Sequence, residues 1–263
     1  MDLGLKGKIA LVCGGSRGMG KAIAKTLAAE GASIALLARD EKQLEAASQE
    51  IREAGAPQVL ALAVDLSRLD EIPKAVKSVK EKFKTVHILI NNAGGPAPGN
   101  FESVSEADWE KALNQNLKSV ITMTREVIPL MKSQKFGRII NITSQLVKEP
   151  PPNMVLSNTA RAGVVAFAKS ISHELASLNI TVNTLCPGTI STDRLRSLVE
   201  KWAKEANQSP AAYEQELLKS VPMKRLGRPE EFAQVAAFLA SEKASYITGT
   251  TIAVDGGTTK SLM

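Results

Sequence analysis

The residues best suited to chemistry form a glycine-rich turn near the start of the chain. Gly14, Gly18 and Gly20 follow the apolar run 9–12 and open a segment of helical apolar spacing that ends at Gly31. Glycine adopts backbone angles that other residues avoid, and it lets the main chain approach a pyrophosphate at a helix N-terminus. An ordinary tight turn could use the same glycines. The position after the first strand, where an open parallel sheet binds a nucleotide, favours a phosphate-binding loop.

Two arginines bear on which dinucleotide such a loop would bind. Arg17 lies in the turn, and Arg39 follows Ala38 at the end of the second apolar run, 33–37. At this place an acid holds a ribose 2′-hydroxyl, whereas a cation accepts a 2′-phosphate. Two arginines on one phosphate favour NADP(H) over NAD(H). The alternative is that both arginines are solvated and Asp40 holds the hydroxyl.

Small and polar residues also follow later strands. Asp65 and Leu66 come after the strand 58–64, where a carboxylate can accept a hydrogen bond from an adenine amino group. The residues 91–94, Asn-Asn-Ala-Gly, follow the strand 86–90 and suit a loop in contact with a cofactor, although they also suit a plain turn.

The elements that must position these residues alternate along the chain. Strand patterns cover residues 9–12, 33–37, 58–64, 86–90, 138–142, 180–185 and 250–254, with helical patterns between them. This order predicts an α/β fold: a doubly wound parallel sheet, Rossmann-like, in three layers and one domain over 1–263. The charged segment 194–219 lies between two Pro/Gly stretches and predicts a helical lid at about 192–222.

Composition narrows the class of protein further. The net charge is +6, but the basic residues are scattered among acids, which fits an anionic cofactor or substrate carrier better than nucleic acid. No signal pattern or membrane-spanning run is present, so we expect no membrane partner. Cys13 and Cys186 each end an apolar run and predict buried inert thiols in a reducing cytoplasm. His87 and His173 have no second ligand at metal spacing, so we expect no metal site.

Together these residues resemble the short-chain dehydrogenase/reductase family over essentially the whole length. In detail the chain is similar to the 3-oxoacyl-[acyl-carrier-protein] reductases. The motifs that carry the resemblance occur in the family's order: Gly14-x-x-x-Gly18-x-Gly20, Asn91-Asn92-Ala93-Gly94, Asn116, Ser144, Pro187-Gly188 and Asp255-Gly256-Gly257.

The resemblance implies a cofactor role for each matching position. The phosphates would be held by Gly14, Ser16, Arg17, Gly18, Met19 and Gly20. The 2′-phosphate would contact Arg39, and the adenine Asp65 and Leu66. The ribose side would be lined by Asn92, Ala93 and Gly94, and the nicotinamide by Pro187, Gly188, Ile190 and Thr192. The family likeness also implies a homotetramer whose interfaces use two long helices and the last strand.

One departure from the family pattern concerns the acid. Family members carry Tyr-x-x-x-Lys on the helix after the serine, where the tyrosine protonates the nascent alkoxide and the lysine grips the nicotinamide ribose. Here Ser157 occupies the tyrosine position and Arg161 the lysine position. A different alignment of this helix with the family motif does not supply the tyrosine either, because the only tyrosines of the chain are Tyr213 and Tyr246. The phenol is absent.

Without the tyrosine, other side chains must carry out the steps of catalysis. An aliphatic hydroxyl such as that of Ser157 is a much weaker acid than a phenol, and it can only orient or relay a proton. Arg161 can grip a ribose but does not donate its proton. Lys148 is the nearest titratable group, and we expect it to donate the proton through Ser157 or water. Ser144 would then polarise the carbonyl. The alternative is that Lys148 is a solvated loop residue.

Two classes of function remain. The first is an NADP(H)-dependent oxidoreductase that moves a hydride between nicotinamide and a carbonyl or secondary alcohol, with a carrier-bound 3-oxoacyl thioester as one candidate. The second is a non-catalytic nucleotide-binding scaffold or sensor that has lost the acid. Asn116 and Ser144 favour the enzyme, because a pure binder has no evident use for them.

Overall fold

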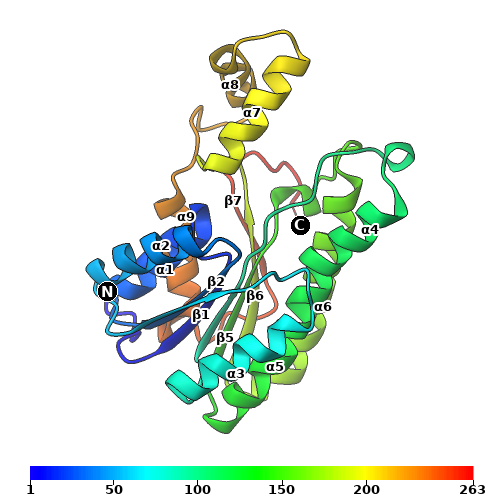
Figure 1. The fold of residues 1–263 in the computed structure, drawn as a ribbon. Coiled ribbons are helices and arrows are strands. Elements are labelled where there is room, and N and C mark those ends of the chain that lie inside the picture. Colours follow the sequence, from blue (N-terminus) through cyan, green and yellow to red (C-terminus); the bar gives the residue numbers. More distant parts are fainter. Residues whose placement is uncertain (263) are drawn as a thin grey trace.

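Seven parallel strands form one sheet in the computed structural model, which describes residues 1–262 (Figure 1). The strands are β1 Ile9–Cys13, β2 Ser33–Ala38, β3 Val59–Ala63, β4 Ile88–Asn91, β5 Gly137–Ile142, β6 Ile180–Pro187 and β7 Thr251–Val254. Their order along the sheet is β3-β2-β1-β4-β5-β6-β7. The order reverses between β1 and β4, and the loops after such strands leave room for a ligand at the carboxyl edge.

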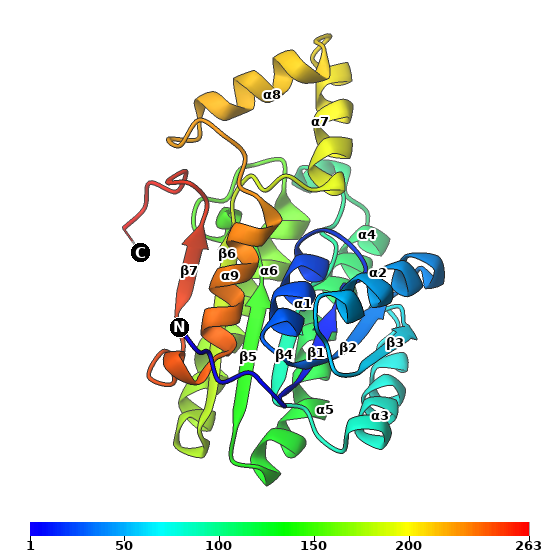
Figure 2. The same ribbon diagram turned by 90° about the vertical axis from the view of Figure 1, so that its left-hand side faces the viewer.

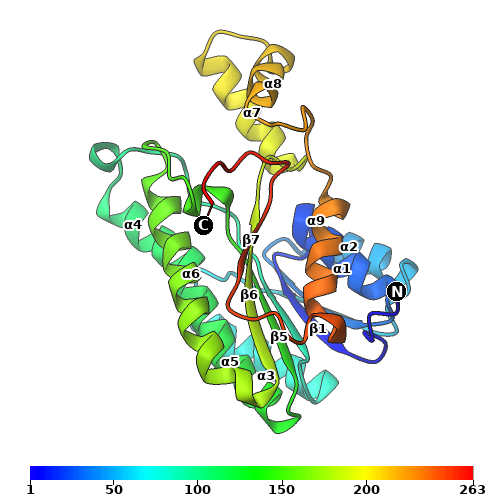
Figure 3. The ribbon, with the colours of Figure 1, turned by 180° about the vertical axis from the view of Figure 1, so that it is seen from behind.

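Helices cover both faces of the sheet, so the predicted doubly wound, three-layer fold is confirmed (Figure 2). One face carries α1 Gly18–Ala29, α2 Glu41–Glu53 and α9 Pro229–Ala240. The other carries α3 Glu71–Phe83, α5 Ser119–Ser133 and α6 Val155–Leu175, with α4 Glu106–Leu113 beyond the carboxyl edge (Figure 3). None of the helices within residues 1–262 combines the length and apolar character that crossing a bilayer requires.

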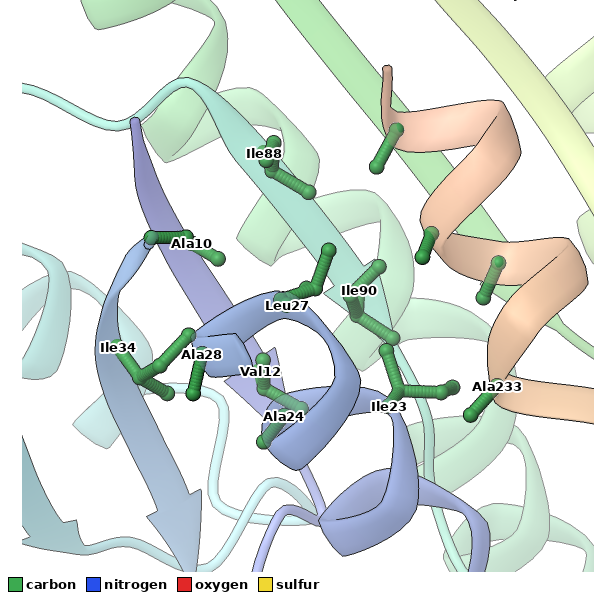
Figure 4. Packing of buried hydrophobic residues seen from close by; sticks show 14 of the residues in the cluster. Ala10, Val12, Ile23, Ala24, Leu27, Ala28, Ile34, Ile88, Ile90 and Ala233 are labelled. Atoms are coloured by element: carbon green, nitrogen blue, oxygen red, sulfur yellow. The ribbon is translucent and has the colours of Figure 1, made fainter. Parts of the chain in front are cut away.

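The alternation of side chains along each strand divides the core into two parts. Ala10 and Val12 of β1 pack toward α1 and α9, whereas Leu11 and Cys13 pack toward α3 and α5. Figure 4 shows the first part, in which Ile23 and other side chains of α1 meet strand residues and Ala233 of α9. Burial on both faces explains why the strands read as continuous apolar runs in the sequence.

Two segments differ from the sequence-based expectation. The long helix expected after Ser105 is interrupted at Asn114–Lys118 by a wider turn, in which the N–H of Ser119 donates to the carbonyl of Asn114. The helical segment 194–219 is two helices, α7 Asp193–Glu205 and α8 Pro210–Lys219. Ser209 caps the second helix and Pro210 begins it, so the break follows from the sequence. Both helices extend beyond the carboxyl edge of the sheet (Figure 1).

Arg138 of β5 is a buried cation at the opposite end of the sheet from the glycine turn, with 1% of its surface exposed. Its Nε donates to the carbonyl of Ser241 at 3.2 Å, and its Nη1 donates to the carbonyls of Gly137 at 2.8 Å and Asn179 at 3.0 Å. The bonds to Asn179 and Ser241 tie β5 to the segments that precede β6 and follow α9.

Arg138→Ala should therefore lower the free energy of unfolding by about 2–4 kcal/mol, because it removes a large buried side chain together with the hydrogen bonds that it donates to three carbonyl groups. Arg52→Ala, at an exposed ion pair of α2, is the matched control and should change it by less than about 0.5 kcal/mol. Chemical denaturation of the three proteins measures the difference. Equal midpoints for all three would contradict the structural role of Arg138.

The two thiols are free and buried, which confirms the prediction for Cys13 and Cys186. Burial raises the pKa of Cys13 to about 12, against a lowering effect of the Asn92 backbone N–H. Because this thiol stays protonated at pH 8, the native protein should not react with an aromatic disulfide reagent, whereas protein unfolded in guanidinium should release two equivalents. Rapid reaction of the native protein would overturn this assignment.

Candidate active site

Several glycines of the turn between β1 and α1 leave no space for a side chain. Gly14 and Gly18 adopt φ angles of +60° and +54°, and a Cβ on Gly20 would lie 2.1 Å from the carbonyl oxygen of Gly14. The side-chain amide of Asn92, after β4, donates to that same carbonyl at 3.3 Å. The backbone of the turn is therefore not covered by side chains at these glycines. The turn leads into the N-terminus of α1, where the side chain of Arg17 does not cap the first N–H groups of the helix. This arrangement fits a phosphate group.

The remaining residues of the turn lie at its two sides. Ser16 and Arg17 line a cleft of about 220 Å³ between α1, α2 and the start of α7, where Asp193 also lines it. Met19 is half-buried against the core. Leu66, Asn92 and Ala93 surround a smaller cavity beside β1 and β4, so the structure brings these three predicted residues together.

Arg39 and Asp65 follow adjacent strands, β2 and β3. Burial alone would raise the pKa of Asp65, but hydrogen bonds from the N–H and hydroxyl of Ser67, together with the charge of Arg39, hold it below its usual value. Burial lowers the pKa of Arg194, and the charge of the nearby Arg17 acts in the same direction. The clamp of Arg17 and Arg39 on one phosphate stays a prediction.

Arg161 of α6 reaches across the carboxyl edge of the sheet. Its Nη1 donates to the carbonyl of Thr143 and to that of Ile142 at 3.2 Å, and its Nη2 donates to the carbonyl of Ala93 at 3.5 Å. Burial lowers its pKa to about 10, and the charge of Arg194 acts in the same direction. The guanidinium is still protonated at neutral pH. It is a fixed cation between the loops that follow β4 and β5.

The hydroxyls of Ser144 and Ser157 can each still donate a hydrogen bond. Ser144 accepts from the N–H of Leu146 at 3.2 Å, which leaves its own proton available for a substrate carbonyl. Ser157 is 4% exposed, and its hydroxyl has no hydrogen-bond partner within residues 1–262. It lies one helical turn before Arg161, on the same face of α6.

Lys148 ends the short turn Gln145–Val147 that follows Ser144. Its charge acts on the buried thiol of Cys186 at the end of β6. The adjacent Glu149 accepts hydrogen bonds from the backbone N–H groups of Lys260 and Ser261 at 2.6 and 2.7 Å. The C-terminal segment therefore holds the loop of Lys148 in place, a contact that the sequence did not predict. Proton donation by Lys148 stays a prediction.

Asn116 lies in the wide turn between α4 and α5 and is buried. Its Nδ2 and the Nε2 of Gln115 both donate to the carbonyl of Gly94 at 2.9 Å, so this turn positions the loop after β4. The Oδ1 of Asn116 and the Oε1 of Gln145 are buried without a hydrogen-bond partner among the described residues. A dinucleotide carries amide and hydroxyl donors of the kind that such acceptors require.

The residues predicted to frame a nicotinamide follow β6. Pro187 ends that strand, and a Cβ on Gly188 would lie 2.6 Å from the Cα of Asp255. Ile190 is buried, and Thr192 caps α7 with its hydroxyl while its methyl lies 3.5 Å from the Cβ position of Gly18. The segment after β6 therefore reaches the glycine turn.

Arg194 is a residue of this edge that the sequence analysis did not single out. Its Nη2 donates to the carbonyl of Pro96 at 3.3 Å. The available signal was its place two residues after Thr192, at the start of the segment interpreted as a lid. No group of three or more metal-ligating side chains occurs in the part of the chain that the structure describes.

Comparisons with known proteins agree with this geometry. A family model described as enoyl-(acyl carrier protein) reductase matches residues 14–259. The chain is 39% identical to the NADPH-dependent reductase BacG of Bacillus subtilis, covering 97% of this chain and 99% of that protein. It is 37% identical to the 3-oxoacyl-[acyl-carrier-protein] reductase FabG of Chlamydia trachomatis, covering 96% and 98%.

A solved structure is similar over the full length. The L-sorbose reductase of Gluconobacter frateurii, crystallised with NADPH and L-sorbose, has a TM-score of 0.95 and 32% identity over 100% of both chains. The matched family model and these relatives show that this chain belongs to the short-chain dehydrogenase/reductase family.

Proposed function

We propose that this protein is an NADP(H)-dependent oxidoreductase that transfers a hydride between nicotinamide and a carbonyl or secondary alcohol. The observation that carries the proposal is Arg161, a cation fixed between the loops after β4 and β5 and one helical turn from Ser157. Relatives of 39% and 32% identity are NADPH-dependent or crystallised with NADPH.

Cofactor binding rests on the crowded glycine turn and its neighbours. The turn and the uncapped N-terminus of α1 receive the pyrophosphate, and Arg17 and Arg39 receive the 2′-phosphate. Asp65 and Leu66 contact the adenine, and Asn92, Ala93 and Gly94 line the ribose. At the other end, Pro187, Gly188, Ile190 and Thr192 frame the nicotinamide.

The chemistry of this chain's own residues differs from the phenol-based scheme. When bound, the cofactor supplies or accepts the hydride. Ser144 donates a hydrogen bond to the carbonyl oxygen, and Arg161 holds the ribose and stabilises developing negative charge. Lys148 delivers the proton through the hydroxyl of Ser157 or a water molecule, and Asn116 keeps the loop at Gly94 in position.

The substrate is a small carbonyl compound or alcohol, with a carrier-bound 3-oxoacyl thioester as one candidate. Relatives named for 3-oxoacyl-[acyl-carrier-protein] and L-sorbose reduction support this range. The helices α7 and α8, within residues 192–222, act as the lid over it.

We further propose a cytoplasmic homotetramer. Free buried thiols fit a reducing compartment. Large apolar side chains are exposed near the outer edge of the sheet, at Phe238 of α9 and at Tyr246 before β7, and Ala162 and Ala166 face outward on α6. These surfaces suit contacts between copies of the chain.

Consumption of NADPH tests the proposed function against the alternative of a non-catalytic scaffold. A panel of 3-oxoesters, sugars, quinones and steroids should contain at least one substrate. Tight NADPH binding without turnover on any carbonyl, beside a working control enzyme, would favour the scaffold.

Arg39→Gln should weaken NADPH binding about 10-fold or more and leave NADH binding nearly unchanged, because only NADPH carries the 2′-phosphate. Fluorescence titration of both cofactors measures the two affinities. Arg52→Gln, which removes the same charge from α2, should affect neither. Equal losses for NADPH and NADH would contradict the assignment of Arg39.

Lys148→Met should lower kcat roughly 100-fold with NADPH affinity retained, because it removes the proton donor but not the cofactor site. Lys243→Met, an exposed lysine far along the chain, is the control. Steady-state kinetics with the best substrate of the panel give the comparison. Unchanged turnover removes Lys148 from the reaction.

A further inference from the structure

Two arginines meet at the loop that follows β4. The Nη2 of Arg194 lies 2.9 Å from the position that a Cβ on Gly95 would take, and the Nη2 of Arg161 lies 3.4 Å from the same point. Both nitrogens therefore lie within 3.4 Å of one point beside this loop. Each guanidinium is also held by a carbonyl of this loop, at Ala93 for Arg161 and Pro96 for Arg194.

No carboxylate balances this pair. Within residues 1–262, neither Arg161 nor Arg194 takes part in an ion pair, and neither does Arg17, whose charge acts on Arg194. Arg196, two residues along the same helix, is paired with Asp193 at 3.8 Å. Burial, followed by the neighbouring positive charge, lowers the pKa of both Arg161 and Arg194. Unbalanced cations at such a distance repel each other, and an anion between them removes that repulsion.

The pair of arginines lies near Ser144, the residue proposed to contact the substrate carbonyl. Arg161 donates to the carbonyl of Thr143, the residue before Ser144. Arg194 contacts Pro96, which belongs to neither the glycine turn nor the loop of Arg39. The proposed cofactor site assigns the phosphates to the N-terminus of α1, Arg17 and Arg39, so Arg194 is available for a different anionic group.

We propose that Arg194, beside Arg161, binds a carboxylate of the substrate, so that the preferred substrates are oxo acids rather than neutral carbonyl compounds. This inference rests on the proposed function and names the substrate class of that same site. The planar guanidinium matches a carboxylate in two parallel hydrogen bonds, whereas a neutral ester offers only weaker acceptors. Arg194 is thus a specificity-determining residue of the first turn of α7.

Matched acids and esters test the charge requirement. Calorimetry on the complex with NADP⁺ measures binding of acetoacetate and ethyl acetoacetate, and of 2-oxobutyrate and its ethyl ester. At least one acid should bind roughly 10- to 100-fold more tightly than its ester. Arg194→Gln should abolish that preference, and Arg196→Gln, which removes the same charge from the same helix, should retain it.

Three results would overturn the proposal. The first is that acids bind no more tightly than their esters. The second is that the acid preference survives Arg194→Gln. The third is that Arg194→Gln weakens NADPH binding while the acid preference persists, which assigns Arg194 to a cofactor phosphate. Turnover is recorded separately from binding. If NADPH binds and acids bind in preference to esters, but no carbonyl is reduced, the proposed function fails while the carboxylate site stands.

Discussion

The candidate site depends on one cation held by backbone carbonyls. Arg161 donates three hydrogen bonds, to the carbonyls of Ile142, Thr143 and Ala93. These bonds join α6 to the end of β5 and to the loops after β4 and β5. A lysine ammonium has three donors in all, whereas the planar guanidinium has five, so an arginine can hold both loops and still present donors to a ligand. In the proposed function the same side chain therefore holds the two loops and binds the cofactor.

That choice changes what the neighbouring residues can do. A cation fixed in this way favours a negatively charged or hydroxyl-bearing ligand, but it does not provide the proton that carbonyl reduction requires. Because Ser157 carries an aliphatic hydroxyl and not a phenol, the proposed function takes the acid from another element. Lys148 lies on the loop that Glu149 attaches to the C-terminal segment. The proposed redistribution of roles thus follows from two positions of one helix, Ser157 and Arg161.

Much of the fold was predictable, because apolar runs and glycine stops mark strands and helices directly. The glycine turn, the strand ends and the spacing of Ser157 and Arg161 were local patterns of this kind. The role of Arg194 was not, since it depends on the approach of α7 to Pro96, 98 residues earlier in the chain. The wide turn at Asn116 was missed because a hydrogen bond such as that of Asn116 to the distant carbonyl of Gly94 leaves no periodic trace in the sequence.

A crystal structure of the NADPH complex tests the central assignment most directly. The account predicts that Arg161 keeps its bonds to the carbonyls of Thr143 and Ile142, donates a further bond to the nicotinamide ribose, and leaves the Ser144 hydroxyl facing the nicotinamide ring. A complex in which Arg161 makes no contact with the cofactor, or in which the nicotinamide lies away from Ser144, would contradict it.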